Sequence, residues 1–356
     1  MADRPQEIRG DELELLVEGK AFSGWEEMTV ARALDAVSAQ FSLVVSDRNP
    51  FPIRPGASCT VKVAGTVLVT GRVDGLEFTG GPKGRSLTVA GRDLTADLVD
   101  CSELSDPGEW SDVGLLELAQ FIAGPFGIEV RALFTEELDP FILFRRQPGE
   151  TAWSAIERAC RLRGVLAFSN GEGVLLLDRP ASTPASAALV EGVNVEEWTI
   201  TVDQSNRFRD YYVRGQISGG DDYSGQLAAE VEGTATDPAI RRFRPLLVLA
   251  EGALTFEDAA DRAQWEATVR AARAARLEVL VQGWRQVPFT GPVWSINQLV
   301  QVRIPSAGLR RSLLVESVVF RRSLEGTSTS LTLTRADAYR PQPIVEDFDD
   351  FLEGDQ

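Results

Sequence analysis

The sequence repeats one pattern in two places, "SLTVAGRDLTADL" at residues 86–98 and "SLTLTRADAYRP" at residues 330–341. Each copy reads Ser-Leu-Thr-apolar and has an aspartate four positions later, Asp93 in the first and Asp337 in the second. Alternating apolar and polar residues are typical of a half-buried strand. The repeat therefore predicts two copies of one strand, each followed by an aspartate where the chain leaves the strand.

The sequence around the two strands repeats as well. "VKV" at residues 61–63 matches "VRI" at residues 302–304, and "LV" at residues 68–69 matches "LL" at residues 313–314. A glycine-containing turn precedes the strand in both copies. Short strands at this spacing favour a small antiparallel barrel. We therefore predict two similar barrels within one chain.

The segment between the two copies differs in predicted secondary structure, because it contains helix signals as well as strand signals. Ser111 is a candidate N-cap of a helix that ends at Gly124, and a second helix ends at Gly164. The Asn170-Gly171 pair predicts a β-hairpin. These features together predict an α+β module. Within the second copy, Thr255 with Asp258 resembles a capping box at the start of an inserted helix.

These patterns predict a mainly β protein in which two small antiparallel β-barrels flank an α+β module. The expected parts are a first barrel at residues 1–104, the α+β module with its linker at 105–188, a second barrel with an inserted helix at 189–340, and an acidic tail at 341–356. A chain of 356 residues is long enough for two or three domains.

The composition is that of a folded soluble protein, with 44% hydrophobic and 25% charged residues. No window approaches the roughly 18 apolar residues of a membrane span. The charged start "MADRPQEIRGDELELL" lacks the apolar core of a signal peptide. We expect a protein that folds and assembles in the cytoplasm without contact to a membrane.

The formal net charge of −17 argues against a protein that reads nucleic-acid sequence, because such proteins need a basic surface. It leaves open contact with nucleic acid that slides past without being held. The other interpretation of the negative charge is that the acidic residues are spread over the outer surface and serve solubility.

The residue types exclude several kinds of catalysis. The sequence contains no histidine, which removes Ser-His-Asp and Cys-His mechanisms and HExxH zinc sites. Carboxylate pairs remain available, but 53 acidic residues make coincidental pairs certain. We predict no catalytic residue and no cofactor.

No metal site is predicted either. The acidic loop "GGDDYSG" at residues 219–225 lacks the alternating ligand spacing of a calcium loop and is interpreted as an exposed turn. Cys59, Cys101 and Cys160 match no zinc motif, and we interpret them as buried free thiols.

The C-terminal stretch "EDFDDFLEGDQ" is too acidic and too short to build a core of its own. Phe348, Phe351 and Leu352 nevertheless have the i, i+3, i+4 spacing of one helical face. A frayed terminus is one interpretation. The other is a docking segment that orders on a neighbouring protein, with these three residues as anchors.

Three stretches carry a resemblance to a known family. They are "TVAGRDLTADLVDC" at residues 88–101, "RLRGVLAFSNGEG" at 161–173 and "GTATDPAIRRFRPLLVLAE" at 233–251. In these stretches, and in their order along residues 13–341, the chain resembles the baseplate hub proteins of phage Mu and its relatives. It is also similar to the hubs of T-even phages and the N-terminal part of type VI secretion spikes. None of these stretches is a catalytic motif.

The resemblance implies a structural hub of a contractile phage tail, a homotrimeric ring between the six-fold tail tube and the three-fold spike. It implies contacts with tube, spike and other baseplate proteins, and passage of DNA through the lumen without specific binding. The predicted duplication agrees, because three chains with two barrels each present six similar barrels. The alternatives are a carbohydrate-cleaving tail enzyme that uses two carboxylates, and a host-binding adhesin.

Overall fold

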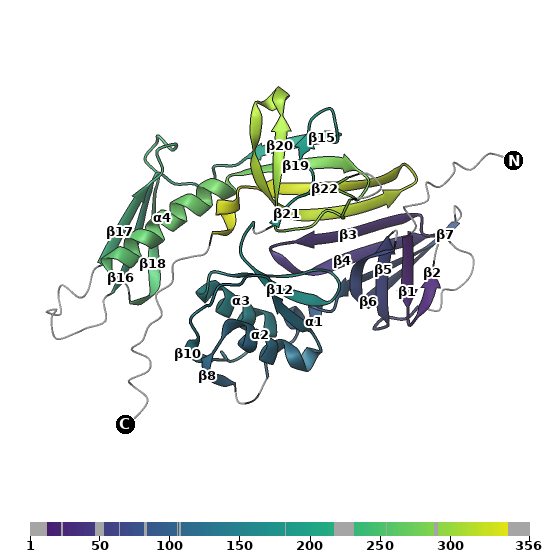
Figure 1. Cartoon of the computed structure of the whole chain (residues 1–356), viewed down its shortest axis with the longest axis horizontal. Coiled ribbons are helices and arrows are strands. Elements are labelled where there is room, and N and C mark those ends of the chain that lie inside the picture. The colour runs from purple at the N-terminus through teal and green to yellow at the C-terminus, as the bar shows by residue number, and fades with distance from the viewer. Residues whose placement is uncertain are drawn as a thin grey trace. The chain divides into compact units, whose positions relative to one another are not determined.

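The computed structural model of the chain is built mainly from β-strands (Figure 1). It describes residues 13–22, 24–46, 53–63, 65–81, 84–104, 106, 108–181, 183–216, 231–253, 255–287 and 291–340. Among these residues, no helix is long and apolar enough to cross a lipid bilayer. The mainly β class predicted from the sequence is confirmed.

The chain forms two compact units, each assembled from separate stretches of sequence. The large unit contains the described residues of 1–160, 166–199 and 278–333. The small unit contains the described residues of 161–165, 200–277 and 334–340. The four parts expected from the sequence divide the chain at other positions, and that division stays a prediction.

The first repeat segment forms seven strands of one large sheet, and these seven pair with one another in antiparallel order. They are β1 (Leu13–Val17), β2 (Lys20–Phe22), β3 (Glu27–Ala33), β4 (Ala36–Val45), β5 (Ser58–Val63), β6 (Thr66–Gly81) and β7 (Gly84–Asp93). Buried and half-buried residues alternate along β1, where Leu13, Leu15 and Val17 are buried. From β3 onward, neighbouring strands follow the order β3–β4–β7–β6–β5.

The second repeat segment contributes seven more strands to the same sheet. They are β13 (Thr183–Pro184), β14 (Leu189–Val190), β15 (Glu197–Val202), β19 (Ala275–Gln282), β20 (Gln298–Ile304), β21 (Leu309–Ser323) and β22 (Gly326–Thr334). Neighbours follow the order β15–β19–β22–β21–β20. This order repeats that of the first segment strand for strand, with β22 in the place of β7.

The two repeated hairpins also share the backbone conformation that opens their last strand. Gly84 at the start of β7 has φ 139°, and Gly326 at the start of β22 has φ 129°. L-residues with a side chain rarely adopt these angles. The glycine that precedes each Ser-Leu-Thr stretch is therefore required by the turn.

The two segments do not close separately among the described residues. Strand β21 pairs with β3 in antiparallel register, from Ser317 opposite Ala33 to Arg322 opposite Met28. This ladder joins the two copies into one 14-stranded sheet. No closed barrel is found in the described part of the chain, so the two barrels stay a prediction.

The small unit interrupts the second copy at one hairpin connection. In the first copy, β3 and β4 are joined by a turn at Leu34 and Asp35. In the second copy, the corresponding neighbours β15 and β19 are separated by residues 203–274. The sequence predicted a helix at this place, whereas the structure has a helix together with a sheet of its own.

The α+β module belongs to the region between the copies. Its elements are α1 (Ala96–Asp100), β8 (Glu109–Val113), α2 (Leu115–Ala123), the 3-10 helix η1 (Gly124–Phe126), β9 (Glu129–Ala132), β10 (Phe141–Arg145), α3 (Ala152–Leu162), β11 (Leu166–Ser169) and β12 (Val174–Asp178). The hairpin predicted at Asn170-Gly171 joins β11 to β12 and is confirmed. Ser111 is not the N-cap of α2, because it lies in β8 and Gly114 occupies that position.

The small unit packs one helix on a three-stranded sheet. Its elements are β16 (Asp210–Gln216), β17 (Val231–Thr236), β18 (Pro245–Ala253), α4 (Phe256–Arg273) and the 3-10 helix η3 (Ala336–Tyr339). The 3-10 helix η2 (Pro305–Ala307) belongs to the large unit. The predicted capping box is present, since Asp258 N donates to Thr255 Oγ1 at 3.2 Å and Thr255 N donates to Asp258 Oδ2 at 3.0 Å. Helix α4 lies over β17 and β16.

Small residues let α4 approach the sheet closely. Ala259, Ala263 and Ala267 recur every fourth residue and are buried in the same cluster as Tyr211. Gly233 on β17 has no room for a side chain, because an added Cβ would overlap the carbonyl group of Ala259. The backbone contact between helix and strand therefore depends on this glycine.

We expect Gly233→Ala to lower the free energy of unfolding of the small unit by about 1–3 kcal/mol, since either α4 or β17 must shift. Urea titration followed by hydrogen exchange of α4 measures the effect. Gly124→Ala is the matched control, because its added Cβ meets nothing within 4 Å and its φ is −54°. Equal stability of the two variants would contradict the packing argument.

Candidate functional site

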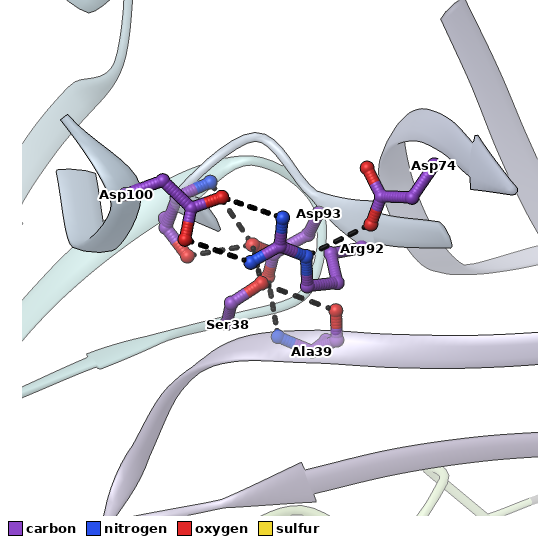
Figure 2. A network of polar contacts seen from close by, with 7 residues as sticks. Ser38, Ala39, Asp74, Arg92, Asp93 and Asp100 are labelled. Atoms are coloured by element: carbon purple, nitrogen blue, oxygen red, sulfur yellow. Dashed lines mark hydrogen bonds and ion pairs between the residues drawn. The ribbon is translucent and has the colours of Figure 1, made fainter. Parts of the chain in front are cut away.

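The side chain of Asp93, at the end of β7, accepts hydrogen bonds from several elements of the large unit. Asp93 is 2% exposed. Its Oδ1 accepts from Thr95 N at 2.9 Å, Thr95 Oγ1 at 2.6 Å and Ser38 Oγ at 3.1 Å. Its Oδ2 accepts from Ala39 N at 3.0 Å and from the Ser169 hydroxyl. Figure 2 shows the Asp93 side chain with the labelled donors Ser38 and Ala39 beside it.

These donors come from three different elements. Ser38 and Ala39 belong to β4, Thr95 precedes α1, and Ser169 ends β11. A buried carboxylate is stable only when hydrogen bonds replace its lost hydration. The Asp93 side chain therefore holds the sheet, the first helix and the β11–β12 hairpin at one point, which we call the Asp93 junction.

The hairpin makes a second contact with the sheet beside this junction. Gly171 N donates to Ser169 Oγ at 2.9 Å, and the Gly171 carbonyl accepts from Thr70 N at 2.7 Å. Gly171 has φ 81°, and an added Cβ would overlap the Leu68 carbonyl oxygen. The glycine predicted as a turn residue therefore also permits close docking of the hairpin on β6.

A buried arginine lies next to the same hairpin. The Arg32 guanidinium donates to the Leu68 carbonyl and is buried. Burial lowers the pKa of Arg32 to about 10, and the nearby carboxylates of Asp93 and Glu172 partly oppose this shift. The positive charge is thus placed where it offsets the buried negative charge of Asp93.

The side chain of the preceding residue, Arg92, lies in a more exposed network. Its Nε lies 2.8 Å from Asp74 Oδ2, and its Nη2 lies 2.6 Å from Asp100 Oδ2 (Figure 2). The hydrogen bonds that Arg92 donates to Asp100 and Asp74 raise the pKa of Arg92, and the bond accepted from Arg92 lowers the pKa of Asp100. Arg92 thereby ties β7 to β6 and α1, although exposed ion pairs of this kind stabilise little.

The Asp93 junction has the hydrogen bonding expected of a structural contact between elements. Five hydrogen bonds to Asp93 occupy both carboxylate oxygens, which leaves little capacity for a substrate or an ion. In the residues that the structure describes, no group of three or more His, Cys, Asp or Glu side chains is placed to hold a metal ion.

The second aspartate of the repeat does not reproduce the first. Asp337 lies in η3, and its side chain is 43% exposed. It pairs with Arg335 at 2.5 Å, two residues away. The sequence pattern is therefore shared, while the hydrogen-bonding role belongs to Asp93 alone.

Other residues singled out in the sequence have mixed outcomes. Cys59 and Cys160 are buried as predicted, and burial raises the pKa of the Cys59 thiol to about 12. Cys101 is exposed, which corrects the prediction for that residue. The loop at residues 219–225 lies outside the described residues. The proposed anchors Phe348, Phe351 and Leu352 also lie outside them.

We expect Asp93→Asn to lower the free energy of unfolding by about 2–4 kcal/mol. The substitution replaces one carboxylate oxygen, an acceptor, with an NH2 group, which cannot accept the hydrogen bonds that the N–H and O–H groups around Asp93 donate. Chemical denaturation measures the change. Asp337→Asn, at the equivalent sequence position, should cost less than about 1 kcal/mol because its ion pair is exposed. Similar losses for both variants would show that the junction is not the stabilising feature.

Three segments of the chain match families of phage proteins. Residues 12–93 match the family described as Mu phage baseplate assembly protein GpP-like, N-terminal. Residues 95–179 match baseplate hub protein gp44-like, second domain. Residues 255–342 match Mu phage baseplate assembly protein GpP, fourth domain.

Whole-chain comparisons agree. The chain is 31% identical over 336 residues to the baseplate hub protein gp44 of Escherichia phage Mu, covering 91% of this chain and 88% of that protein. The 43 kDa tail protein of prophage MuSo2 from Shewanella oneidensis is 30% identical, with a TM-score of 0.84, 94% of this chain and 100% of that chain covered. A tail protein from Neisseria meningitidis MC58 has the same fold at 22% identity, with a TM-score of 0.78 and coverage of 94% and 99%. The chain therefore belongs to the family of Mu-like phage baseplate hub proteins.

Proposed function

We propose that the chain forms a homotrimeric ring that adapts a six-fold tail tube to a three-fold spike and lets the genome pass. Membership in the hub family gives the chain a structural role in a phage baseplate and places it in the virion tail. The observation that carries the finer proposal is the repeated strand order, β3–β4–β7–β6–β5 and β15–β19–β22–β21–β20.

Symmetry explains why a duplicated segment suits this role. A ring of three chains with two similar segments each presents six similar surfaces to one neighbour and three identical sets to the other. Neither the tube nor the spike then has to break its own symmetry. The proposed partners are accordingly the tail tube protein, the central spike protein and other baseplate proteins.

The strands at the two ends of the large sheet support contacts between subunits. Strands β15 and β2 end the main path of the sheet, so each presents one unpaired edge among the described residues. Ile200 and Val202 on β15 are 37% and 62% exposed. Exposed apolar edges favour pairing with another chain. Pairing within a ring would cover them.

A structural role also fits the surroundings of two buried acidic residues, Asp93 and Glu266. Asp93 is saturated with donors, and Glu266 is paired with Arg262 at 3.1 Å and with Arg270 at 2.9 Å. Carboxylates held in this way are poorly suited to general acid or base catalysis, which needs a group free to exchange a proton. We therefore propose no enzymatic activity.

The trimer is tested by mass. We expect native mass spectrometry or light scattering to give about three times the 38.8 kDa chain, alone or on addition of tube or spike protein. The control is the same measurement on the tube and spike proteins without this chain. A monomer that joins neither partner would overturn the proposed ring, while the family membership would stand.

The charge of the ring is tested by its structure. Three copies carry a formal charge of −51, from −17 per chain. We expect part of this charge to line the lumen, where it repels DNA phosphates over a Debye length of about 8 Å and prevents retention. The electrostatic potential along the three-fold axis of a trimer structure measures this. A neutral or positive lumen would contradict the expectation.

A further inference from the structure

The sheet of the small unit has one face that α4 does not cover. Side chains alternate along a strand, so Val213 faces the helix while Tyr212 and Arg214 face the opposite side. In register with them on β18 are Leu247, opposite Tyr212, and Leu249, opposite Arg214. We call this side of β16 and β18 the open face.

The open face is apolar along β18. Leu247 is 50% exposed and Leu249 is 71% exposed, and Phe243, just before the strand, is 79% exposed. Among the described residues β18 pairs only with β16, so its other edge is free. Clustered exposed apolar side chains on an open edge strand mark a surface that another segment covers.

The stretch of chain that leads into and forms this apolar strip is basic, whereas Arg214 on the neighbouring strand is paired with Glu232. Residues 238–250 contain three arginines and no acidic residue, in a chain whose net charge is −17. Arg241 and Arg242 are exposed, and in the described part of the chain neither has an ion pair or hydrogen bond. A complementary occupant therefore combines apolar side chains with negative charge.

The C-terminal segment of this chain, residues 341–356, has that combination. It contains six acidic residues and no lysine or arginine, together with Phe348, Phe351 and Leu352. Its charge and its apolar spacing match the two features of the open face.

The segment also starts in the right place. Trp265 Nε1 on α4 donates to the Arg340 carbonyl at 2.7 Å, and Arg273 Nε donates to the Ala338 carbonyl at 3.1 Å. These bonds fix the last described residue within the small unit. Residues 341–347 span up to about 23 Å when extended. That length passes a helix about 10–12 Å in diameter and reaches the other side of a three-stranded sheet.

We propose that residues 341–356 bind the open face of their own chain, with Phe348 and Phe351 on Leu247 and Leu249 and the acidic residues beside Arg241 and Arg242. The segment covers the exposed apolar side chains of an edge strand, which would otherwise be open to contact with other chains. The attraction between the charges weakens as salt rises, whereas the apolar contact does not.

Cross-linking in the full chain tests the position. The exposed Cys101 is first replaced by Cys101→Ser, and the pair Leu249→Cys with Phe351→Cys is treated with a short bismaleimide. We expect a link within one chain, identified by peptide mapping. The matched control pair is Glu257→Cys with Phe351→Cys, because Glu257 is exposed on α4, which covers the other face of the same sheet. Equal yields from both pairs, or links only between chains, would overturn the proposal.

Hydrogen exchange gives a second test without cysteines. In the full chain, Phe348→Ser with Phe351→Ser should speed exchange of β18 by about threefold or more, while β7 stays unchanged. Gln342→Ser is the control for a change in the same segment. Unchanged exchange of β18 in the double variant would also overturn the proposal, whatever the oligomeric state of the hub.

Discussion

The large unit depends on one buried negative charge. A carboxylate removed from water loses several kcal/mol of hydration unless donors surround it. Asp93 finds these donors on β4, at the start of α1 and at the end of β11. Because no single element supplies all of them, none of the three can move away without leaving the charge unsatisfied. The strand exit, the helix and the hairpin consequently behave as one body.

Local patterns in the sequence were sufficient for much of the fold. The Ser-Leu-Thr repeat predicted the common strands, and the structure extends the likeness to five strands in the same order. Thr255 with Asp258 predicted the start of α4, and Asn170-Gly171 predicted the turn between β11 and β12. Each of these signals acts between residues that are close in sequence, where residue type alone restricts the backbone.

Long-range partners could not be predicted in the same way. Alternation fixes which face of a strand is buried and says nothing about which strand lies beside it, so the pairing of β21 with β3 was missed. The Asp93 junction joins Ser38 and Ser169 to a residue 55 and 76 positions away. Serines occur at many surface positions, and no pattern distinguishes these two. Asp337 shares the sequence pattern without a comparable set of donors.

The ladder between β3 and β21 has a consequence for synthesis on the ribosome. Ser317 pairs with Ala33, 284 positions earlier, so the first copy emerges with β3 unpaired along one side. Loop closure over this distance is slow compared with formation of the β6–β7 hairpin. An open strand that waits for its neighbour is prone to pair with other nascent chains. Expression at low temperature, or with chaperones that shield strand edges, should therefore raise the yield of correctly folded chain.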